Sequence, residues 1–249
     1  MPTKVVACVS PSEARRHSPA ASWVATAAAR PSRRWVVDGE PLRHEARDAA
    51  AGDELDAVAP IAERVAALKV GDPFDPDTTI GPLVSAEHHD KVMRYMKLAL
   101  DSGARHIVGG EVPTGDEFGG DLASGNWVMP AVFADCTDGM EFVTDEVFGP
   151  LMSVLVFDTE DEVVERANAT PYGLSAGVFS KDFARANRVG NALQAGSVWI
   201  NDYGTLPASV PFGGYKQSGI GRENGANAIE HYTQVKMIYS SLVPVEQYM

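Results

Sequence analysis

The chain has 249 residues, of which 45% are hydrophobic and 22% charged, the composition of an ordinary globular protein with enough residues for a sizeable core. No apolar run approaches the roughly 20 residues of a membrane-spanning helix, and the N-terminus lacks a basic-then-apolar secretory pattern, so we expect a cytoplasmic protein without a membrane partner. The formal net charge of −13 argues against a nucleic-acid partner, because an acidic surface repels phosphate.

Cysteine and histidine give no sign of a metal or disulfide framework. The only two cysteines are Cys8 and Cys136. The six histidines are scattered without metal-ligand spacing, and we interpret the adjacent His88 and His89 as solvated residues of one helix.

Residues 1–52 differ in composition from the rest of the chain. They are rich in Ala, Arg, Ser and Pro, and no hydrophobic period lasts more than a few residues. A transit peptide is one interpretation, since such peptides are rich in Arg and Ser, but Glu13 and the prolines argue against it. The preferred hypothesis is an atypical segment, disordered or read out of frame. Reading the encoding DNA in its other frames tests it.

From Asp53 onward the hydrophobic periodicity predicts helices and short strands. One helical stripe runs from Leu55 to Leu68 and ends before Gly71. Ser85 has the position of an N-cap for a second helix. The core-facing positions expected on these helices are Leu55, Val58, Ala62, Val65, Leu68, Val92, Met96 and Ala99. Strands are expected at 105–108 and at 127–133.

The stretch from 151 to 201 predicts a β-α-β-α-β unit. The apolar run 152–157 indicates a strand buried on both faces. Thr159 and Glu162 form a capping box for the helix that follows, and Ser180 is the expected cap of the next helix. That helix should bury Phe183, Ala186, Val189 and Leu193. With strands at 174–179 and 198–200, the order predicts a parallel sheet with right-handed crossovers.

The segment Pro211–Gly225 contains five glycines in fifteen residues, which indicates tight turns. The glycines do not have dinucleotide-binding spacing, and the phosphate-loop pattern is absent. Spacing alone leaves open whether this is a surface loop or a shaped polar site. A helix over 222–232 and an alternating, half-exposed strand over 232–239 are expected after it.

Several motifs nevertheless resemble one family. Pro211–Gly225 resembles the C-terminal signature of the NAD(P)-dependent aldehyde dehydrogenase superfamily, and Glu141–Pro150 resembles its Glu-Glu-x-Phe-Gly-Pro motif. Val70–Pro73, Gly81–Ser85 and Trp199–Asn201 follow in the family order. The amino-acid sequence from Tyr215 to Gly225 is most similar to that of betaine-aldehyde dehydrogenases.

The resemblance implies an α/β fold and a domain plan. A mostly parallel, three-layer sheet of the family's catalytic domain is expected over 53–233, followed by an oligomerisation strand and tail over 234–249. The implied partners are an aldehyde substrate and either further copies of the chain or an intact family subunit.

The resemblance also implies roles for residues on two motifs. Glu146 matches the glutamate that binds the nicotinamide-side ribose of NAD or NADP, and Phe148 matches the residue that packs against the nicotinamide. Tyr203 falls where the family lines its substrate tunnel with aromatic residues, which attract quaternary ammonium groups. A turn carboxylate and a core tyrosine are the plainer interpretations.

In the glycine-rich loop, Glu223 matches a glutamate with a charge-relay role. Lys216 and Gly219 match positions whose backbone carbonyls hold a potassium ion. A surface ion pair between Lys216 and Glu223 is the plainer alternative.

The two motifs that contain the family's nucleophile and general base do not occur in this sequence. A thiolate attacks the aldehyde, hydride passes to the nicotinamide, and a base activates water. The window matching the nucleophile motif Gly-Gln-x-Cys, roughly Trp35 to Pro41, contains no cysteine, and the base motif Glu-Leu-Gly-Gly-Lys does not occur. Cys136 matches a structural position. We therefore expect an aldehyde dehydrogenase by descent that is inactive alone. The alternatives are a non-catalytic fragment that pairs with an intact subunit, or a remnant without function.

Overall fold

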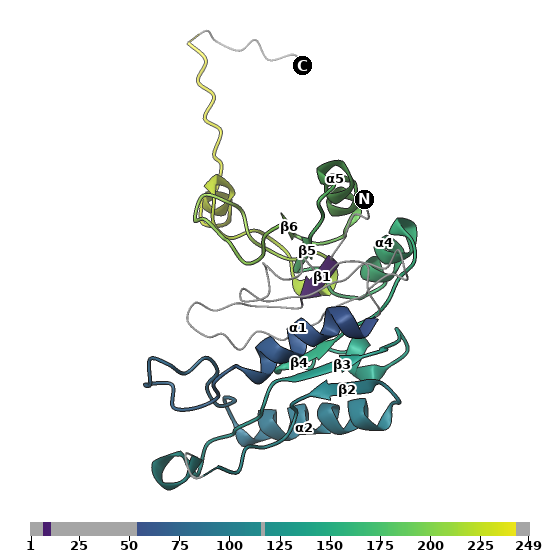
Figure 1. Ribbon diagram of the computed structural model, residues 1–249. Helices are drawn as coiled ribbons and strands as arrows, with labels where there is room; N and C mark the ends of the chain where they lie inside the picture. Colours follow the sequence, from purple (N-terminus) through teal and green to yellow (C-terminus); the bar gives the residue numbers. More distant parts are fainter. Residues whose placement is uncertain (1–6, 11–53, 116–117, 243–249) are drawn as a thin grey trace.

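The computed structural model describes residues 7–10, 54–115 and 118–242 of the chain. They form two three-stranded sheets with helices packed against them, and a tail leaves the body at the C-terminal end (Figure 1). Each sheet contains a parallel strand pair, and the predicted α/β class is confirmed. Apart from residues 7–10, the atypical segment 1–52 lies outside the described residues. No helix in the described ranges is long and apolar enough to cross a membrane.

The first sheet has a helix on each face. Its elements are β2 (Arg105–Val108), β3 (Ala131–Ala134), β4 (Leu151–Ser153), α1 (Glu54–Ala66) and α2 (Ala86–Asp101). In the order β2-β3-β4, β2 is antiparallel and β4 parallel to β3. Successive side chains of a strand point to opposite faces. Val132 and Ala134 therefore pack with α1. Ala131 and Phe133 pack with α2, so helix, sheet and helix form three layers (Figure 1).

Both helices form as the sequence predicts. α1 buries Val58 and Val65 from the expected stripe, together with Ile61. The hydroxyl of Ser85 caps α2 by accepting a hydrogen bond from the backbone N–H of His88 at 3.1 Å. The buried residues of α2 are Val92, Tyr95, Met96 and Ala99.

The second sheet contains the last two strands of the predicted β-α-β-α-β unit. Its elements are β1 (Ala7–Ser10), β5 (Ser175–Val178) and β6 (Ser197–Ile200), with the helices α4 (Glu160–Asn168) and α5 (Phe183–Ala192). β5 and β6 are parallel and α5 connects them, as the β-α-β pattern predicts. β1 pairs antiparallel with the other edge of β5.

The prediction that 152–157 joins this same sheet is wrong. That run contributes only the short strand β4, which pairs with β3 in the first sheet, with Leu151 opposite Ala131. Val154, Leu155 and Phe157 are buried beyond the end of the strand. An apolar run indicates burial, but it does not indicate which strand lies next to it.

Two further boundaries differ from prediction. β3 begins at Ala131 rather than at 127, directly after Pro130, which has no N–H to donate to a ladder. The cap of α5 is Asp182, not Ser180: the Asp182 carboxylate accepts a hydrogen bond from the backbone N–H of Arg185 at 3.0 Å, whereas the Ser180 hydroxyl accepts from the N–H of Asp182, before the helix begins. Phe183 therefore begins the helix on its outer side and is 67% exposed, against the prediction that it is buried.

The predicted helix over 222–232 is shorter than expected. The backbones of Phe212 and Glu223 exchange two hydrogen bonds of 2.7 Å, which hold the start of that segment in an antiparallel bridge. Only the 3₁₀ turn η5 follows. The remaining short helices are α3 (Glu141–Thr144), η3 (Gly120–Leu122), η4 (Lys216–Ser218) and η5 (Ala226–His231).

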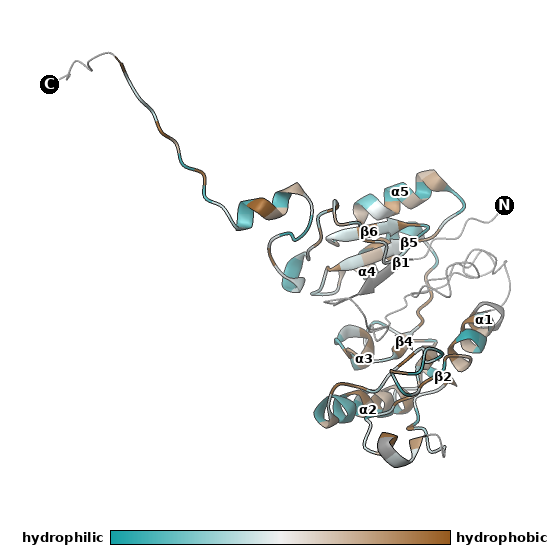
Figure 2. Cartoon of the chain, turned by 90° about the vertical axis from the view of Figure 1, so that its left-hand side faces the viewer, coloured by the Kyte–Doolittle hydropathy of each residue, from teal (hydrophilic) through white to brown (hydrophobic). Residues whose placement is uncertain are grey.

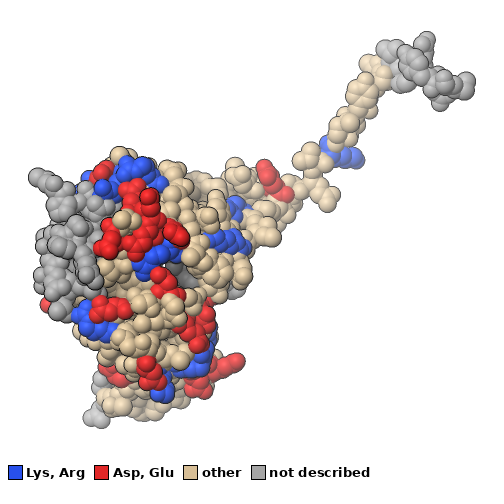
Figure 3. Space-filling view, turned by 90° about the vertical axis from the view of Figure 1, so that its right-hand side faces the viewer, with Lys and Arg blue, Asp and Glu red and all other residues tan. Residues whose placement is uncertain are grey.

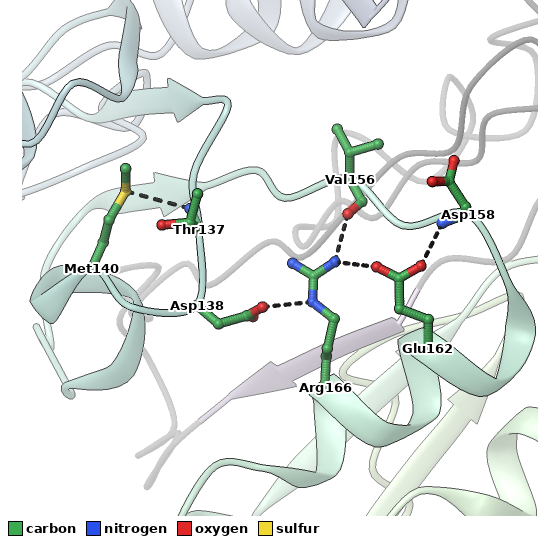
Figure 4. A network of polar contacts seen from close by, with 7 residues as sticks. All are labelled: Thr137, Asp138, Met140, Val156, Asp158, Glu162 and Arg166. Carbon is green, nitrogen blue, oxygen red and sulfur yellow. Dashed lines mark hydrogen bonds and ion pairs between the residues drawn. The ribbon is translucent and has the colours of Figure 1, made fainter.

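Arg166 of α4 ties the two halves of the body together (Figure 4). Its Nη1 atom donates to the carbonyl of Val156 and to Glu162, the latter at 2.8 Å. Its Nε atom forms an ion pair at 2.7 Å, without hydrogen-bond alignment, with Asp138 in the turn after β3. Glu162 in turn accepts a hydrogen bond from the backbone of Asp158. A helix beside the second sheet is thus fixed to a loop of the first.

The tail from Thr233 to Leu242 is extended and leaves the body (Figures 1 and 2). Among the described residues it pairs with no strand, so the predicted strand at 232–239 is not formed there. A strand needs a partner for its backbone hydrogen bonds. Its large apolar side chains are exposed: Val235, Met237, Ile238, Tyr239 and Leu242.

Charged residues are mixed on the surface. On the face in Figure 3, acidic and basic side chains lie side by side rather than forming a continuous basic surface. Together with the net charge of −13, this agrees with the absence of a nucleic-acid partner, which stays a prediction.

Candidate functional site

The loop from Glu146 to Gly149, between α3 and β4, brings two of the predicted site residues to the surface. Phe148 has φ of 55°, in the left-handed region that non-glycine residues rarely occupy, and its side chain is 39% exposed. Glu146 is half-buried two residues earlier. Val147 between them is buried and anchors the loop in the core.

The first turns of α2 hold this loop by its backbone. The Nε2 atom of His88 lies 2.7 Å from the carbonyl oxygen of Phe148, and the two rings are 5.9 Å apart at their centroids. The Nζ atom of Lys91 donates to the carbonyl of Glu146 at 2.9 Å. The interpretation of His88 as a merely solvated residue is therefore wrong. The neighbouring His89 has a different contact: its Nδ1 atom lies 3.7 Å from the carboxylate of the exposed Asp90.

The same helix also holds the segment before the loop. The Tyr95 hydroxyl donates to Asp145 at 2.8 Å, and Arg94 pairs with Glu141 at 2.9 Å. Burial, followed by the hydrogen bond to Asp145, raises the pKa of Tyr95, so the phenol keeps its proton. Contacts from successive turns of α2 therefore run along the whole segment from Glu141 to Phe148.

Tyr203 lies after β6 in a cluster of its own. Its hydroxyl is 3.1 Å from the hydroxyl of Ser175, and its ring lies 4.9 Å from that of Trp199. The indole of Trp199 donates to the carbonyl of Thr205 at 2.8 Å. Two aromatic rings thus lie at the end of β6, where the sequence predicts one.

The ammonium group of Lys216 fixes the glycine-rich loop to the end of α4. The Nζ atom of Lys216 donates to the carbonyls of Asn168, the last residue of α4, and of Thr170 just after it, at 2.7 and 3.0 Å. The described bonds of Glu223 are the backbone pair with Phe212, and its side chain is exposed. Gly219 has φ of 120°, which only glycine adopts readily. Among the described contacts, Lys216 therefore bonds to these two carbonyls and does not form an ion pair with Glu223.

Cys136 is a core residue. It is 5% exposed and its thiol donates to the carbonyl of Phe133 at 3.4 Å. A thiol in such surroundings is inert, as the sequence interpretation expects. The side chain of Cys8 lies outside the described residues. Within those residues no group of three or more His, Cys, Asp or Glu side chains is arranged to hold a metal ion.

The predicted site residues therefore fall into two groups. Glu146 and Phe148 share one loop on the first sheet's side. Tyr203, Lys216, Gly219 and Glu223 belong to the loops after β6. The residues that sequence reasoning missed are His88 and Lys91, because their contacts join positions 60 and 55 residues apart and no local pattern announces them.

Comparison with known proteins defines the class. The aldehyde dehydrogenase family profile matches residues 53–238, and the chain belongs to this family. A betaine aldehyde dehydrogenase of Cereibacter sphaeroides is 51% identical over 189 residues, which make up 76% of this chain but 38% of that protein. The chain thus spans well under half the length of the curated relatives it matches.

Solved structures agree in fold. Betaine aldehyde dehydrogenase from Staphylococcus aureus in complex with NAD⁺ has a TM-score of 0.68 and 40% identity, over 76% of this chain and 39% of that one. The HpcC protein of Thermus thermophilus has a TM-score of 0.69 and 39% identity, over 77% of this chain and 38% of that one.

Proposed function

We propose that this chain carries part of the catalytic domain of an NAD(P)-dependent aldehyde dehydrogenase whose substrate class is betaine aldehyde or a similar trimethylammonio-aldehyde. The similarity to betaine aldehyde dehydrogenases supports the substrate class. The main support for a role in cofactor binding is the loop with Glu146 and Phe148. Its strained backbone keeps a carboxylate and an aromatic ring at the surface.

The residues of this loop fit the nicotinamide end of a dinucleotide. A carboxylate accepts hydrogen bonds from both hydroxyls of a ribose, which is the role proposed for Glu146. The ring of Phe148 is exposed enough to pack against a planar heterocycle. The bound dinucleotide would supply the hydride acceptor. Nothing in these two residues selects NAD over NADP.

Binding of NAD⁺ to the purified chain tests this assignment. NAD⁺ should raise the melting temperature, since a ligand that binds only the folded state stabilises it. Phe148→Ala should remove most of that shift. Phe183→Ala is the matched control, because Phe183 is an exposed phenylalanine on α5. A shift that is absent in the wild type, or equal in both variants, would refute the assignment.

On the substrate side we propose Tyr203. The adjacent ring of Trp199 supports this role, because paired aromatic faces attract a quaternary ammonium group more strongly than one. Tyr203→Leu should weaken protection by betaine aldehyde against thermal unfolding, while Tyr239→Leu on the exposed tail should leave it unchanged. Equal protection of the two variants would contradict the role.

Potassium and charge relay stay proposals for the glycine-rich loop. Backbone carbonyls suit an alkali cation, so Lys216 and Gly219 fit such a site by chemical type. The Lys216 ammonium, however, already occupies two neighbouring carbonyls, so the loop does not depend on an added ion for its fold. Exchanging potassium for sodium should therefore change the melting temperature little. The exposed side chain of Glu223 leaves it accessible for a relay role.

We further propose that the chain alone does not oxidise aldehydes. The described thiol, Cys136, is buried in the core and does not lie on the loop of Glu146 and Phe148. Neither family motif for nucleophile or base occurs in the sequence. The cytoplasmic location also stays a prediction.

A second candidate function is pairing with an intact family subunit. The extended tail favours it, because residues 234–240 leave the body in an extended conformation with exposed apolar side chains, as a strand that pairs with a neighbouring chain would need. Co-elution of the chain with purified, intact betaine aldehyde dehydrogenase tests it. Deletion of 234–249 should abolish co-elution, and co-elution that survives the deletion would exclude the tail as the contact.

A further inference from the structure

The backbone of the Glu146–Gly149 loop has a conformation that it would not keep by itself. Phe148 lies in the left-handed region, which is strained for a non-glycine residue and persists only where the surrounding structure imposes it. The loop is also short of regular partners, since it lies between the single turn of α3 and the start of β4. Something outside the loop must therefore fix its shape.

Three residues on one face of α2 do so. Lys91 and Val92 follow His88 by three and four residues, so each lies next to His88 on the helix surface. His88 and Lys91 bond to the carbonyls of Phe148 and Glu146. Val92 packs so closely against Gly149 that a Cβ atom there would lie 2.5 Å from its Cγ2. The helix therefore contacts three of the four loop residues, each from a different side chain.

The chemistry of these contacts defines the state of His88. A carbonyl oxygen can only accept, so His88 must carry a proton on Nε2. Both the protonated ring and one neutral tautomer satisfy this, whereas the other neutral tautomer does not. The bond thus selects a tautomer of His88 without requiring its charge, and a side-chain amide can replace it.

We infer that α2 is the positioning helix of this loop: His88 and Lys91 hold the backbone of Phe148 and Glu146 so that the ring and the carboxylate are presented together. Neither side chain is required to touch a ligand, so both are positioning residues rather than catalytic ones. The identity of the ligand, a nicotinamide dinucleotide, rests on the proposed function. The contacts of His88 and Lys91 with the loop backbone, which we call the clamp, do not rest on it.

Amide NMR of the full chain tests the clamp directly. His88→Ala should shift or broaden the resonances of Phe148 and Gly149, and His88→Gln should restore them, because glutamine keeps an N–H donor but cannot titrate. His89→Ala is the matched control on the same turn. For the second contact, Lys91→Ala should shift the resonance of Val147, with Lys97→Ala as the control, since Lys97 pairs only locally with Asp101 at 2.7 Å.

Titration with NAD⁺, followed through the same resonances, tests the consequence. Loss of one hydrogen bond should raise the apparent Kd of His88→Ala roughly two- to tenfold over wild type, with the Gln and His89→Ala variants close to wild type. If His88→Ala leaves the loop resonances where His89→Ala leaves them, the clamp is refuted. If the resonances move but NAD⁺ affinity does not, the positioning role is refuted. If NAD⁺ disturbs no resonance of the wild type, the proposed function fails, while the amide shifts still decide the clamp.

Discussion

Replacement of Gly149 by alanine probes the packing between the loop and α2. An added Cβ would lie 2.5 Å from Cγ2 and 3.0 Å from Cγ1 of Val92, whereas carbon atoms normally approach to about 3.5–4.0 Å. Val92 is fully buried and β-branched, so it cannot rotate away. Loop and helix must therefore separate by about 1 Å, an overpacking that costs roughly 1–3 kcal/mol. For a chain of this size the melting temperature should fall by about 2–12 °C.

Urea and thermal unfolding of matched variants measure this cost. Gly139→Ala is the control, because a Cβ there meets nothing within 4 Å, and it should stay within about 0.5 kcal/mol of wild type. In a Val92→Ala background the Gly149→Ala change should cost much less, since the two clashing methyl groups are gone. A cost equal in both backgrounds, or no larger than that of Gly139→Ala, would show that the two elements are not packed as described.

Three more outcomes follow from the structure. The pKa of Glu162 lies below its ordinary value of 4.5, chiefly because its carboxylate accepts a hydrogen bond from the Asp158 backbone, with Arg166 adding to the effect; its stabilisation is present above that value and lost as the pH falls through the lowered pKa. Glu162→Gln should therefore destabilise more at neutral pH than in acid in urea unfolding, and an equal loss at both would contradict this. In a Cys8→Ala background, Cys136 should react with a thiol reagent only as fast as the chain unfolds; rapid labelling without denaturant would disprove its burial. Deletion of 234–249 should change the unfolding free energy by less than about 0.5 kcal/mol, because the described part of the tail, 234–242, is exposed, and a larger loss would show that the tail packs on the body.

Local patterns predicted the helices well and strand pairing poorly. The Ser85 and Thr159 caps were predictable because a hydroxyl three residues before its N–H partner is a feature of adjacent sequence. The placement of β4 beside β3 was not, because it depends on segments far apart in the chain. Asp182 rather than Ser180 caps α5, because the helix begins at Phe183 and the Ser180 hydroxyl accepts from the N–H of Asp182, before the helix begins.

The candidate site divides in the same way. Glu146 and Phe148 could be found from a motif, since they lie within one short segment. His88 could not, because its role arises only when α2 packs against the loop 60 residues later. The adjacent His89 looks equivalent in sequence, and only the fold distinguishes them.

We propose that the loop of Glu146 and Phe148 serves a nicotinamide dinucleotide and that the chain alone does not oxidise aldehydes; among the described side chains, the thiol of Cys136 is buried in the core. Formation of NADH from NAD⁺ and betaine aldehyde by the purified chain tests this proposal most directly, with intact betaine aldehyde dehydrogenase as the positive control. We predict no NADH from the wild type, Cys8→Ala or Cys136→Ala chains. Turnover by the wild type would contradict the account, and its loss in one cysteine variant would identify the thiol responsible.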